Sequence, residues 1–537
     1  MSEESKEIDP KVTEEVLEEG EEASAADEAE DAADSAAKTV KKKKKSKAKK
    51  LKEAITGNAG EPSEPKRSLT REQFQGLLEI NPALKSEVAR MDPKKVEELM
   101  KGLTLDEALT GTTLGGKNQK DMASYKFWNT QPVPSFSEIK EKAMEEGPIK
   151  TIDIDKVPKE PAPMHKGFEW VTVDITDPKE RQEVYELLTN HYVEDGEATF
   201  RFNYSGSFLN WALKAPGWRK SWHVGVRVSE SKKLVAFISA IPVDLKVRKA
   251  TLKCSEVNYL CVHKKLRDKR LAPVLIKEIT RRCYLEGVFQ AVYTAGALLP
   301  TPFSTCRYFH RSLDWEKLHE VGFSPLPHGS TPQRQIIKYR LPTVTATEGL
   351  RPLREEDCEE ALDLLQRYLG RFEFAPEFTL DEFKHWLLHD PEKAPEQVVW
   401  AWVVEDRKTK KITDLFSFYR LESTAMRSQK YKVLKAAYLF YYATETAFDT
   451  DKSKLEPRLN LLVKDALILA KKENFDVLNA LTLLDNPLFL EKQLFGAGDG
   501  HLHYYMYNYR TAPIPGGVDA KNRPSAKAMG GIGLVML

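Results

Sequence analysis

The sequence contains few cysteines, no long apolar run and almost no net charge. Its 537 residues include five cysteines, none of them in a CxxC pair, so neither a disulfide framework nor a cysteine zinc site is predicted. No apolar run approaches the roughly 18–20 residues of a membrane-spanning helix. The acidic start at Met1–Glu4 is unlike a secretory leader. Together these absences predict a cytoplasmic protein without a membrane span.

The formal net charge of +1 argues against a protein whose whole surface binds nucleic acid, but it conceals two charged segments. Residues 1–34 contain 15 acidic residues and two lysines, whereas residues 38–52 contain ten lysines and no acidic residue. Residues 1–66 also have almost no aromatic or β-branched side chains, so we expect a disordered tail. The run Lys41–Lys50 is either a solvated stretch or an arm that binds the ribosome or another polyanion.

Beyond the tail, the composition favours one large folded core. Hydrophobic residues make up 41% of the chain and aromatic residues 9%, which is enough to fill a sizeable interior. Short amphipathic patches in residues 67–119 predict a helical connector. The folded core is expected from about residue 120 to the C-terminus.

This core contains a weak internal duplication when the region from about residue 170 is laid over the region from about residue 348. The paired segments are Val184–Tyr192 and Ala361–Tyr368, Phe208–Leu213 and Phe383–Leu388, His223–Val228 and Trp400–Val404, Leu234–Ile238 and Ile412–Phe416, Val257–His263 and Ala436–Tyr442, Pro273–Leu285 and Arg458–Lys472, and Phe289–Thr294 and Val477–Leu483. Each series has the order β-α-(α)-β-β-β-α-β. The pattern predicts an α/β fold with two pseudo-symmetric halves, residues 120–345 and 346–537, around a mixed sheet.

This order resembles the GCN5-related N-acetyltransferase fold, in which the N-terminus of a central helix binds the pyrophosphate of coenzyme A. In the first half, Lys269 and Arg270 precede the expected helix, and Pro273 suits its first position. The corresponding part of the second half carries Asp449, Asp451 and Glu456, which are unsuited to phosphate. We therefore expect the acyl-CoA site in the first half and the peptide site in the second.

Several segments resemble one family more closely, the fungal-type protein N-myristoyltransferases (glycylpeptide N-tetradecanoyltransferases). The two main segments are Glu256–His263 and Phe495–Tyr505, and they are joined by Tyr125–Trp128, Tyr192–Asp195, Phe200–Phe202, Tyr293–Gly296, Cys306–Tyr308 and the terminal Gly533–Leu537. The resemblance covers residues 120–537 in order. It implies an acyltransferase that moves a myristoyl group from myristoyl-CoA, a co-substrate, to the N-terminal glycine of proteins.

The sequence has no GxSxG motif, so a covalent acyl-enzyme is not required and direct attack by the amine suffices. The resemblance implies an oxyanion hole made by the backbone amides of Tyr259 and Leu260, where a bulging strand would aim two N–H groups at one oxygen. It also implies that the α-carboxylate of Leu537 is the general base, with Asn258 and Thr294 forming hydrogen bonds near the attacking amine. Burial of the apolar end of the chain would raise the pKa of that carboxylate.

The resemblance also carries over binding residues. Those for coenzyme A are Tyr125, Lys126, Phe127, Trp128, Leu260, Val262, Arg267, Asp268, Lys269, Arg270, Leu271, Ala272 and Pro273. Those for an extended peptide are Tyr192, Val193, Glu194, Asp195, Phe200, Phe202, Tyr204, Tyr308, His310, Asp499 and Gly500. The acidic members suit substrates with lysine or arginine near the N-terminus. Apart from myristoyl-CoA and the peptide, we expect no bound prosthetic group, and we expect the protein to be a monomer.

Plainer interpretations exist for several of these residues. His263 and Cys261 lie in an apolar strand and are typical of core packing, and Phe200, Phe202 and Tyr204 have the spacing of one buried strand face. His501 and His503 lack a third ligand at metal spacing, so no metal site is predicted. For the whole chain, the alternatives are an acetyltransferase-fold enzyme of other acyl specificity and a non-catalytic module that binds peptides or ribosomes.

Overall fold

The computed structural model describes residues 125–136, 138, 144–193, 199–267, 269–391, 396–519, 521–528 and 531–537. All of them belong to one unit of the chain, which includes Tyr125–Leu537. The expected tail (1–66) and connector (67–119) lie outside the described residues. The boundary expected between residues 345 and 346 stays a prediction.

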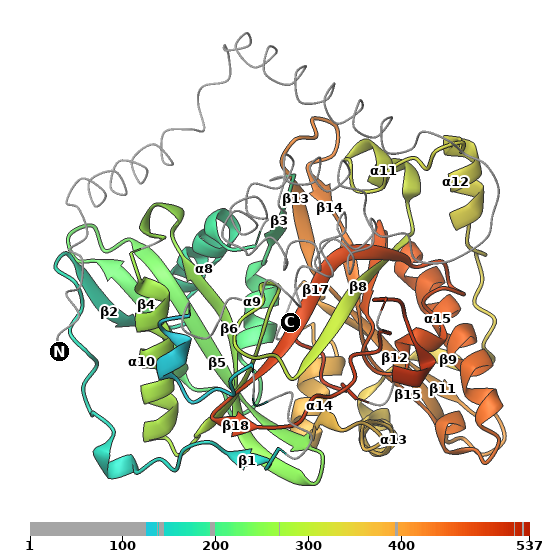
Figure 1. Cartoon of the computed structure of the whole chain (residues 1–537). Coiled ribbons are helices and arrows are strands. Elements are labelled where there is room, and N and C mark those ends of the chain that lie inside the picture. The colour runs from blue at the N-terminus through green and yellow to red at the C-terminus, as the bar shows by residue number, and fades with distance from the viewer. Residues whose placement is uncertain are drawn as a thin grey trace, which may run out of the picture. The chain divides into compact units, whose positions relative to one another are not determined.

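A single mixed sheet of 13 strands forms the centre of this unit (Figure 1). Its first-half members are β2 (Phe168–Thr172), β4 (His223–Val228), β5 (Leu234–Val247), β6 (Ala250–Val262), β7 (Gln290–Ala295) and β8 (Ser304–Ser312). Its second-half members are β9 (Leu350–Pro352), β10 (Phe374–Pro376), β11 (Val399–Glu405), β12 (Ile412–Arg420), β15 (Ala436–Thr444), β16 (Val477–Leu481) and β17 (Gly496–Tyr507). The strand order is β2-β4-β5-β6-β7-β17-β8-β16-β15-β12-β11-β9, with β10 paired to β5 outside this path.

The strand directions repeat from one half to the other. In the first half, β2, β4, β5 and β6 pair antiparallel and β7 then pairs parallel to β6. In the second half, β9, β11, β12 and β15 pair antiparallel and β16 then pairs parallel to β15. This repetition confirms the predicted α/β fold with two pseudo-symmetric halves around a mixed sheet.

The two halves are joined by an exchange of strands at the centre of the sheet. Strand β8 pairs antiparallel with β16 of the second half, while β17 pairs antiparallel with β7 of the first half. Strands β8 and β17 also pair with each other, and Figure 1 shows them side by side between the green and orange halves. Backbone hydrogen bonds therefore continue across the sheet from one half to the other.

Helices cover this sheet in matching sets. They are α8 (Pro178–His191), α9 (Gly206–Leu213) and α10 (Leu271–Leu285) in the first half, α13 (Cys358–Leu369), α14 (Leu380–Leu387) and α15 (Leu455–Lys472) in the second, and α11 (Trp315–Glu320) and α12 (Pro332–Tyr339) between them. Acidic residues precede the first helix of each set, as expected, and Asp177 caps α8 by accepting from Lys179 N–H. Among the described residues, no helix combines the length and apolar character needed to span a bilayer.

Two small sheets lie outside the main one. Strand β3 (Phe200–Asn203) of the first half pairs with β13 (Glu422–Ala425), which in turn pairs with β14 (Val433–Leu434). Strands β1 (Gly147–Pro148) and β18 (Tyr509–Arg510) form the other. The β3–β13 and β1–β18 pairs, like the β5–β10 pair of the main sheet, are further places where the halves share backbone hydrogen bonds.

Candidate active site

The candidate site is built around an irregularity in strand β6. Phe237 of β5 pairs with Cys261, but Ser239 pairs with Asn258, so Tyr259 and Leu260 together face one residue of β5. Tyr259 has a left-handed backbone with a φ of 59°. This is a β-bulge, and two successive N–H groups flanking a left-handed residue form a concavity suited to an anion. The predicted oxyanion-hole residues therefore lie where the strand has the necessary shape.

The Tyr259 side chain is buried in a group of tyrosines that includes two residues predicted for the peptide. Its ring centroid lies 6.1 Å from that of Tyr192 and 5.5 Å from that of Tyr204. Burial raises the pKa of Tyr192 above its usual range, and the nearby Tyr259 backbone opposes this in part. The peptide-binding prediction and the oxyanion-hole prediction thus converge on one place in the fold.

The end of the chain is held inside the protein. Residues Gly531–Met536, the main part of a C-terminal tail that ends at Leu537, are all buried. Gly533 N–H donates to the Phe374 carbonyl at 2.6 Å, and Leu484 N–H donates to the Ile532 carbonyl at 2.8 Å. These backbone bonds dock the apolar tail, and the half-buried Leu537 ends it near the middle of the view in Figure 1.

Two buried tyrosines from the second half hold the tail close to its end. The backbone N–H of Val535 donates to the Tyr441 hydroxyl at 3.1 Å, and the Tyr504 hydroxyl donates to the Leu534 carbonyl at 3.0 Å. Sequence reasoning assigned no role to either tyrosine. Tyr504 belongs to Phe495–Tyr505, one of the segments that resemble the family. The residue spacing in that segment does not indicate that Tyr504 contacts the C-terminal tail.

The other predicted catalytic residues lie on the strands beside this tail. Asn258 Nδ2 donates to Glu256 Oε1 at 2.8 Å, two residues back along β6. Thr294 of β7 pairs directly with Tyr504 of β17, the tyrosine that holds Leu534. No role was predicted for Glu256 from the sequence either. The signal that could have indicated one is its position, as an acidic residue at the start of an apolar strand segment.

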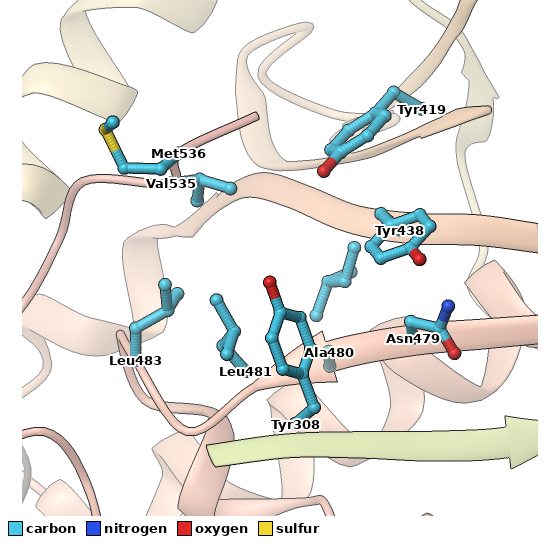
Figure 2. Close-up of a pocket in the computed structure, with 10 residues that line it drawn as sticks. Tyr308, Tyr419, Tyr438, Asn479, Ala480, Leu481, Leu483, Val535 and Met536 are labelled. Carbon is cyan, nitrogen blue, oxygen red and sulfur yellow. The ribbon is translucent and has the colours of Figure 1, made fainter. Parts of the chain in front are cut away.

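A cavity beside the tail is lined in part by Tyr308, a residue of the predicted peptide site. It is lined by Tyr308, Tyr419, Tyr438, Leu439, Asn479, Ala480, Leu481, Leu483, Val535 and Met536. Figure 2 shows Tyr308 extending toward Val535, with Tyr419 and Tyr438 across from it. We call this space the tyrosine cavity. The tail therefore borders the place where the peptide was expected.

The predicted peptide residues on β8 and β17 meet at a second irregularity. Ala497 pairs with Phe309 but His501 pairs with Arg307, so Gly498, Asp499 and Gly500 bulge opposite Tyr308. A Cβ at Gly498 would come within 2.4 Å of His310 Nε2, so a glycine is required at this position. His310 Nδ1 lies 2.7 Å from Asn479 Oδ1, and burial lowers the pKa of the His310 imidazole.

Aromatic contacts link the remaining predicted peptide residues. The Phe202 ring lies 5.8 Å from Tyr204 and 6.5 Å from Tyr438 of the tyrosine cavity. The Phe200 ring lies 5.7 Å from Phe323, whose ring is 5.3 Å from His310. Val193 is exposed, and its carbonyl accepts a backbone hydrogen bond from Phe202 N–H at 3.2 Å. The structure thus brings the described members of this set together, and Glu194 and Asp195 lie outside the described residues.

The predicted diphosphate site lies where β6 leads into α10, with one correction. Helix α10 begins at Leu271, so Pro273 is its third residue and not its first. This position tolerates proline because the first four N–H groups of a helix have no intrahelical partner. Arg270 has a left-handed backbone at the helix start, with a φ of 61°.

The other residues predicted for coenzyme A are distributed around this turn and one strand edge. Leu260, Val262, Leu271 and Ala272 precede or open α10, whereas the Arg267 guanidinium donates to the His191 carbonyl at the end of α8. Lys269 is partly buried, and Asp268 lies outside the described residues. Strands β6 and β7 pair only at residues 254–256 and 290–292, so their ends diverge beside this turn.

The segment Tyr125–Trp128 lies against the first half at β7. The Trp128 ring stacks on Tyr293 with a centroid separation of 5.7 Å, and Tyr293 stacks on Tyr505 at 5.0 Å. The Tyr125 hydroxyl donates to the Leu298 carbonyl at 3.3 Å. Lys126 is exposed and Phe127 contacts Trp128 edge-on. The aromatic members of the segment are therefore fixed next to Thr294.

The described histidines and cysteines show no sign of metal or nucleophilic chemistry. Within the described ranges, no group of three or more His, Cys, Asp or Glu side chains is placed to hold a metal ion. All five cysteines are free and buried, and burial raises the pKa of Cys261 to about 12. A thiol that is protonated at neutral pH is a poor nucleophile.

Two family models match the chain. The N-terminal domain of myristoyl-CoA:protein N-myristoyltransferase matches residues 148–306, and the C-terminal domain of the same family matches residues 320–535. Together the two matches cover more than half of the sequence and contain the bulge at Tyr259 and most of the docked tail.

Named relatives and solved structures agree with this match. The chain is 60% identical over 470 residues to a glycylpeptide N-tetradecanoyltransferase of Aspergillus fumigatus, covering 88% of this chain and 95% of the relative. It is 48% identical over 457 residues to that of Saccharomyces cerevisiae, covering 83% and 98%. A crystal structure of Saccharomyces cerevisiae N-myristoyltransferase with bound myristoyl-CoA superposes with a TM-score of 0.74 at 48% identity, covering 78% of this chain and 96% of that one. The chain belongs to the myristoyl-CoA:protein N-myristoyltransferase family.

Proposed function

We propose that this protein transfers the myristoyl group of myristoyl-CoA to the N-terminal glycine amine of other proteins. The observation that carries the proposal is the bulge at Tyr259 and Leu260 in the same buried region as the docked C-terminal tail. The first supplies donors for a developing oxyanion, and the second supplies a carboxylate without any side chain. Family membership identifies the acyl donor and the acceptor amine.

In the proposed mechanism, the thioester carbonyl oxygen accepts hydrogen bonds from the N–H groups of Tyr259 and Leu260. The Leu537 carboxylate removes a proton from the glycine ammonium, while Asn258 and Thr294 orient the amine. The free amine then attacks the carbonyl carbon, and coenzyme A leaves as its thiol. Loss of one oxyanion donor typically slows such a reaction about 100- to 1,000-fold.

The same proposal assigns the two substrates to the two described parts of the site. Lys269 and Arg270, with the first N–H groups of α10, would bind the coenzyme A phosphates, since a helix start and cations both favour anions. The tyrosine rings packed around Tyr259 would limit the space for the first residue of the peptide, which favours glycine. Asp499 is exposed beside the tyrosine cavity and would attract a basic residue further along the peptide.

An acylation assay with matched peptides tests the proposed function. The protein is incubated with myristoyl-CoA and either a peptide that starts with glycine or the same peptide starting with alanine. We expect labelling of the glycine peptide only, and much slower transfer from acetyl-CoA, because a short acyl chain leaves apolar contacts unmade. Equal labelling of both peptides, or none, would contradict the proposal. Preferential use of acetyl-CoA would favour an ordinary acetyltransferase instead.

We also propose that the lysine run Lys41–Lys50, outside the described residues, binds the ribosome or a similar polyanion. A chain in which the ten lysines of residues 38–52 are replaced by glutamine should keep its peptide acylation but lose co-sedimentation with ribosomes at low salt. In the unaltered chain that association should weaken steeply between about 50 and 200 mM salt, since counterion release drives it. Binding that ignores salt, or survives the substitutions, would refute the role of this segment.

A cytoplasmic location and a monomeric state complete the proposal. All five cysteines are free in the described chain, which suits a reducing compartment. Both substrate sites are assembled from residues of one chain, so the proposed reaction needs no second copy.

A further inference from the structure

A second cavity lies on the tail and is distinct from the tyrosine cavity. Its lining includes Glu256, Glu377, Glu382, Trp386, Tyr441 and Leu537. Val535 borders both spaces, so the C-terminal tail runs between them. We call this second space the acidic cavity, because three glutamates and the terminal residue line it and no described lysine or arginine does.

The glutamates of the acidic cavity differ sharply in exposure. Glu256 is 6% exposed, whereas Glu382 is partly exposed and Glu377 is fully on the surface. Glu382 is also occupied as the partner of Thr379 at the start of α14, with an N···O distance of 2.7 Å. The cavity therefore leads from a buried carboxyl group at its inner end to an exposed one at its rim.

Glu256 is surrounded by the groups that hold the active site. Asn258 donates to it at 2.8 Å, and the Glu256 charge, together with burial, raises the pKa values of Tyr441 and Tyr504 above their usual range. Those two tyrosines bind the tail at Val535 and Leu534. The terminal residue, Leu537, lines the same cavity. None of these groups is a cation, and the hydrogen bond from Asn258 only partly offsets the effect of burial, which raises the pKa of Glu256.

On these grounds, and resting on the proposed function, we propose that Glu256 accepts the reaction proton from the Leu537 carboxylate and passes it to solvent through the acidic cavity. The glycine ammonium carries three hydrogens; one stays on the amide nitrogen, one ends on the coenzyme A thiol, and one is released. The terminal carboxylate takes this last proton first and must lose it before the next turnover. A transfer from the Leu537 carboxylic acid to the Glu256 carboxylate restores the base, and Glu256 then gives the proton to water.

The titration behaviour of Glu256 suits this role. Burial raises its pKa to about 7, against an ordinary value of 4.5. A group with a pKa near the working pH can both accept and release a proton efficiently. The titratable and polar groups around Glu256 are those of Asn258, Tyr259, Tyr441, Tyr504, Glu377, Glu382 and Leu537.

The test is the substitution Glu256→Gln in the full-length protein, which keeps the side-chain oxygen that accepts from Asn258. The steady-state kcat for acylation is measured from pH 6 to 9 with myristoyl-CoA and a glycine peptide, because the proposed relay restores the base between turnovers. We expect a loss of about 10- to 100-fold at pH 7, smaller than the 100- to 10,000-fold typical of a direct general base. Near pH 9 the variant should approach the unaltered protein, because the peptide amine, with a pKa of about 8, then binds already neutral.

Thermal unfolding supplies a readout that does not depend on activity. Because the pKa of Glu256 is raised from 4.5 to about 7 in the folded state, the fold loses stability as the pH rises from about 4.5 to about 7, and the loss is constant above that. Glu256→Gln should therefore gain thermal stability relative to the unaltered protein as the pH rises from 5 to 7, with a constant difference from pH 7 to 9. The same difference at pH 5 and at pH 7 would contradict a titrating Glu256.

Glu377→Gln serves as the matched control, since it removes an exposed carboxylate from the rim of the same cavity. Its rate should remain within twofold of the unaltered protein at each pH. An equal deficit of Glu256→Gln at all pH values would show a merely structural role, and no deficit at pH 7 would show no role; either result overturns the relay. Failure of the unaltered protein to prefer the glycine peptide would instead overturn the proposed function.

Discussion

Two residues added after Leu537 should lower kcat for peptide acylation by about 100- to 10,000-fold, the range expected for loss of a general base. The extension turns the terminal carboxylate into an uncharged amide, which cannot accept the proton of the glycine ammonium. Deletion of Leu537 should have an effect of the same order, because the new terminus would lie one residue back, at Met536. The substrate sites themselves remain in place, so binding of myristoyl-CoA should change little.

The matched control carries the same two residues at the N-terminus. The melting temperature of the C-terminally extended chain should stay close to that of the control, because the tail is anchored upstream of its end, at Gly533, Leu534 and Val535. Steady-state kinetics and thermal unfolding on both chains separate the two effects. Unchanged kcat in the extended chain would eliminate the Leu537 carboxylate as the base.

The substitution Gly531→Ala should displace the C-terminal tail and reduce activity about 10- to 100-fold. A Cβ at this position would lie 1.9 Å from the Pro515 carbonyl oxygen and 2.8 Å from Ile514 Cγ2, so a backbone segment has to move. Forcing an extra carbon into a packed interior typically costs about 1–3 kcal/mol. Because the Gly531 carbonyl also accepts from Phe374 N–H at 3.0 Å, the shift weakens the docking of the tail.

Gly206→Ala is the appropriate control for this variant. Its new Cβ would meet only Arg181 Nε, at an ordinary 3.5 Å, at the start of α9. The activity and melting temperature of the control should match those of the unaltered protein. If Gly531→Ala also retains full kcat, the exact position of the tail does not matter for the reaction, and the assignment of its end as the base loses its geometric support.

Much of this site could be predicted from local sequence. The segment Glu256–His263 identified the strand and, through resemblance, the amides of Tyr259 and Leu260, and the structure places a bulge there. Such features can be predicted from the sequence because they depend on residues that are neighbours in the chain. The contacts of Tyr441 and Tyr504 with the tail were not predicted, since they join residues 94 and 30 positions apart without any shared pattern.

The pairing of the strands could not be predicted from the sequence either. The internal duplication predicted the strands β7 and β16 but not β8 or β17, and a strand pattern does not identify the neighbouring strand. The start of α10 was misplaced by two residues for a related reason. Proline is acceptable anywhere among the unpaired N–H groups of the first turn, so Pro273 marks the beginning of the helix without fixing its first residue.

The exchange of β8 and β17 between the halves also has a meaning for the origin of this protein. Each half lacks one strand that the other supplies, as in a two-fold homodimer whose subunits swap an element. Joining two copies of such a subunit in one gene would yield this topology directly. Divergence of the two copies then accounts for basic residues before α10 in one half and acidic residues before α15 in the other.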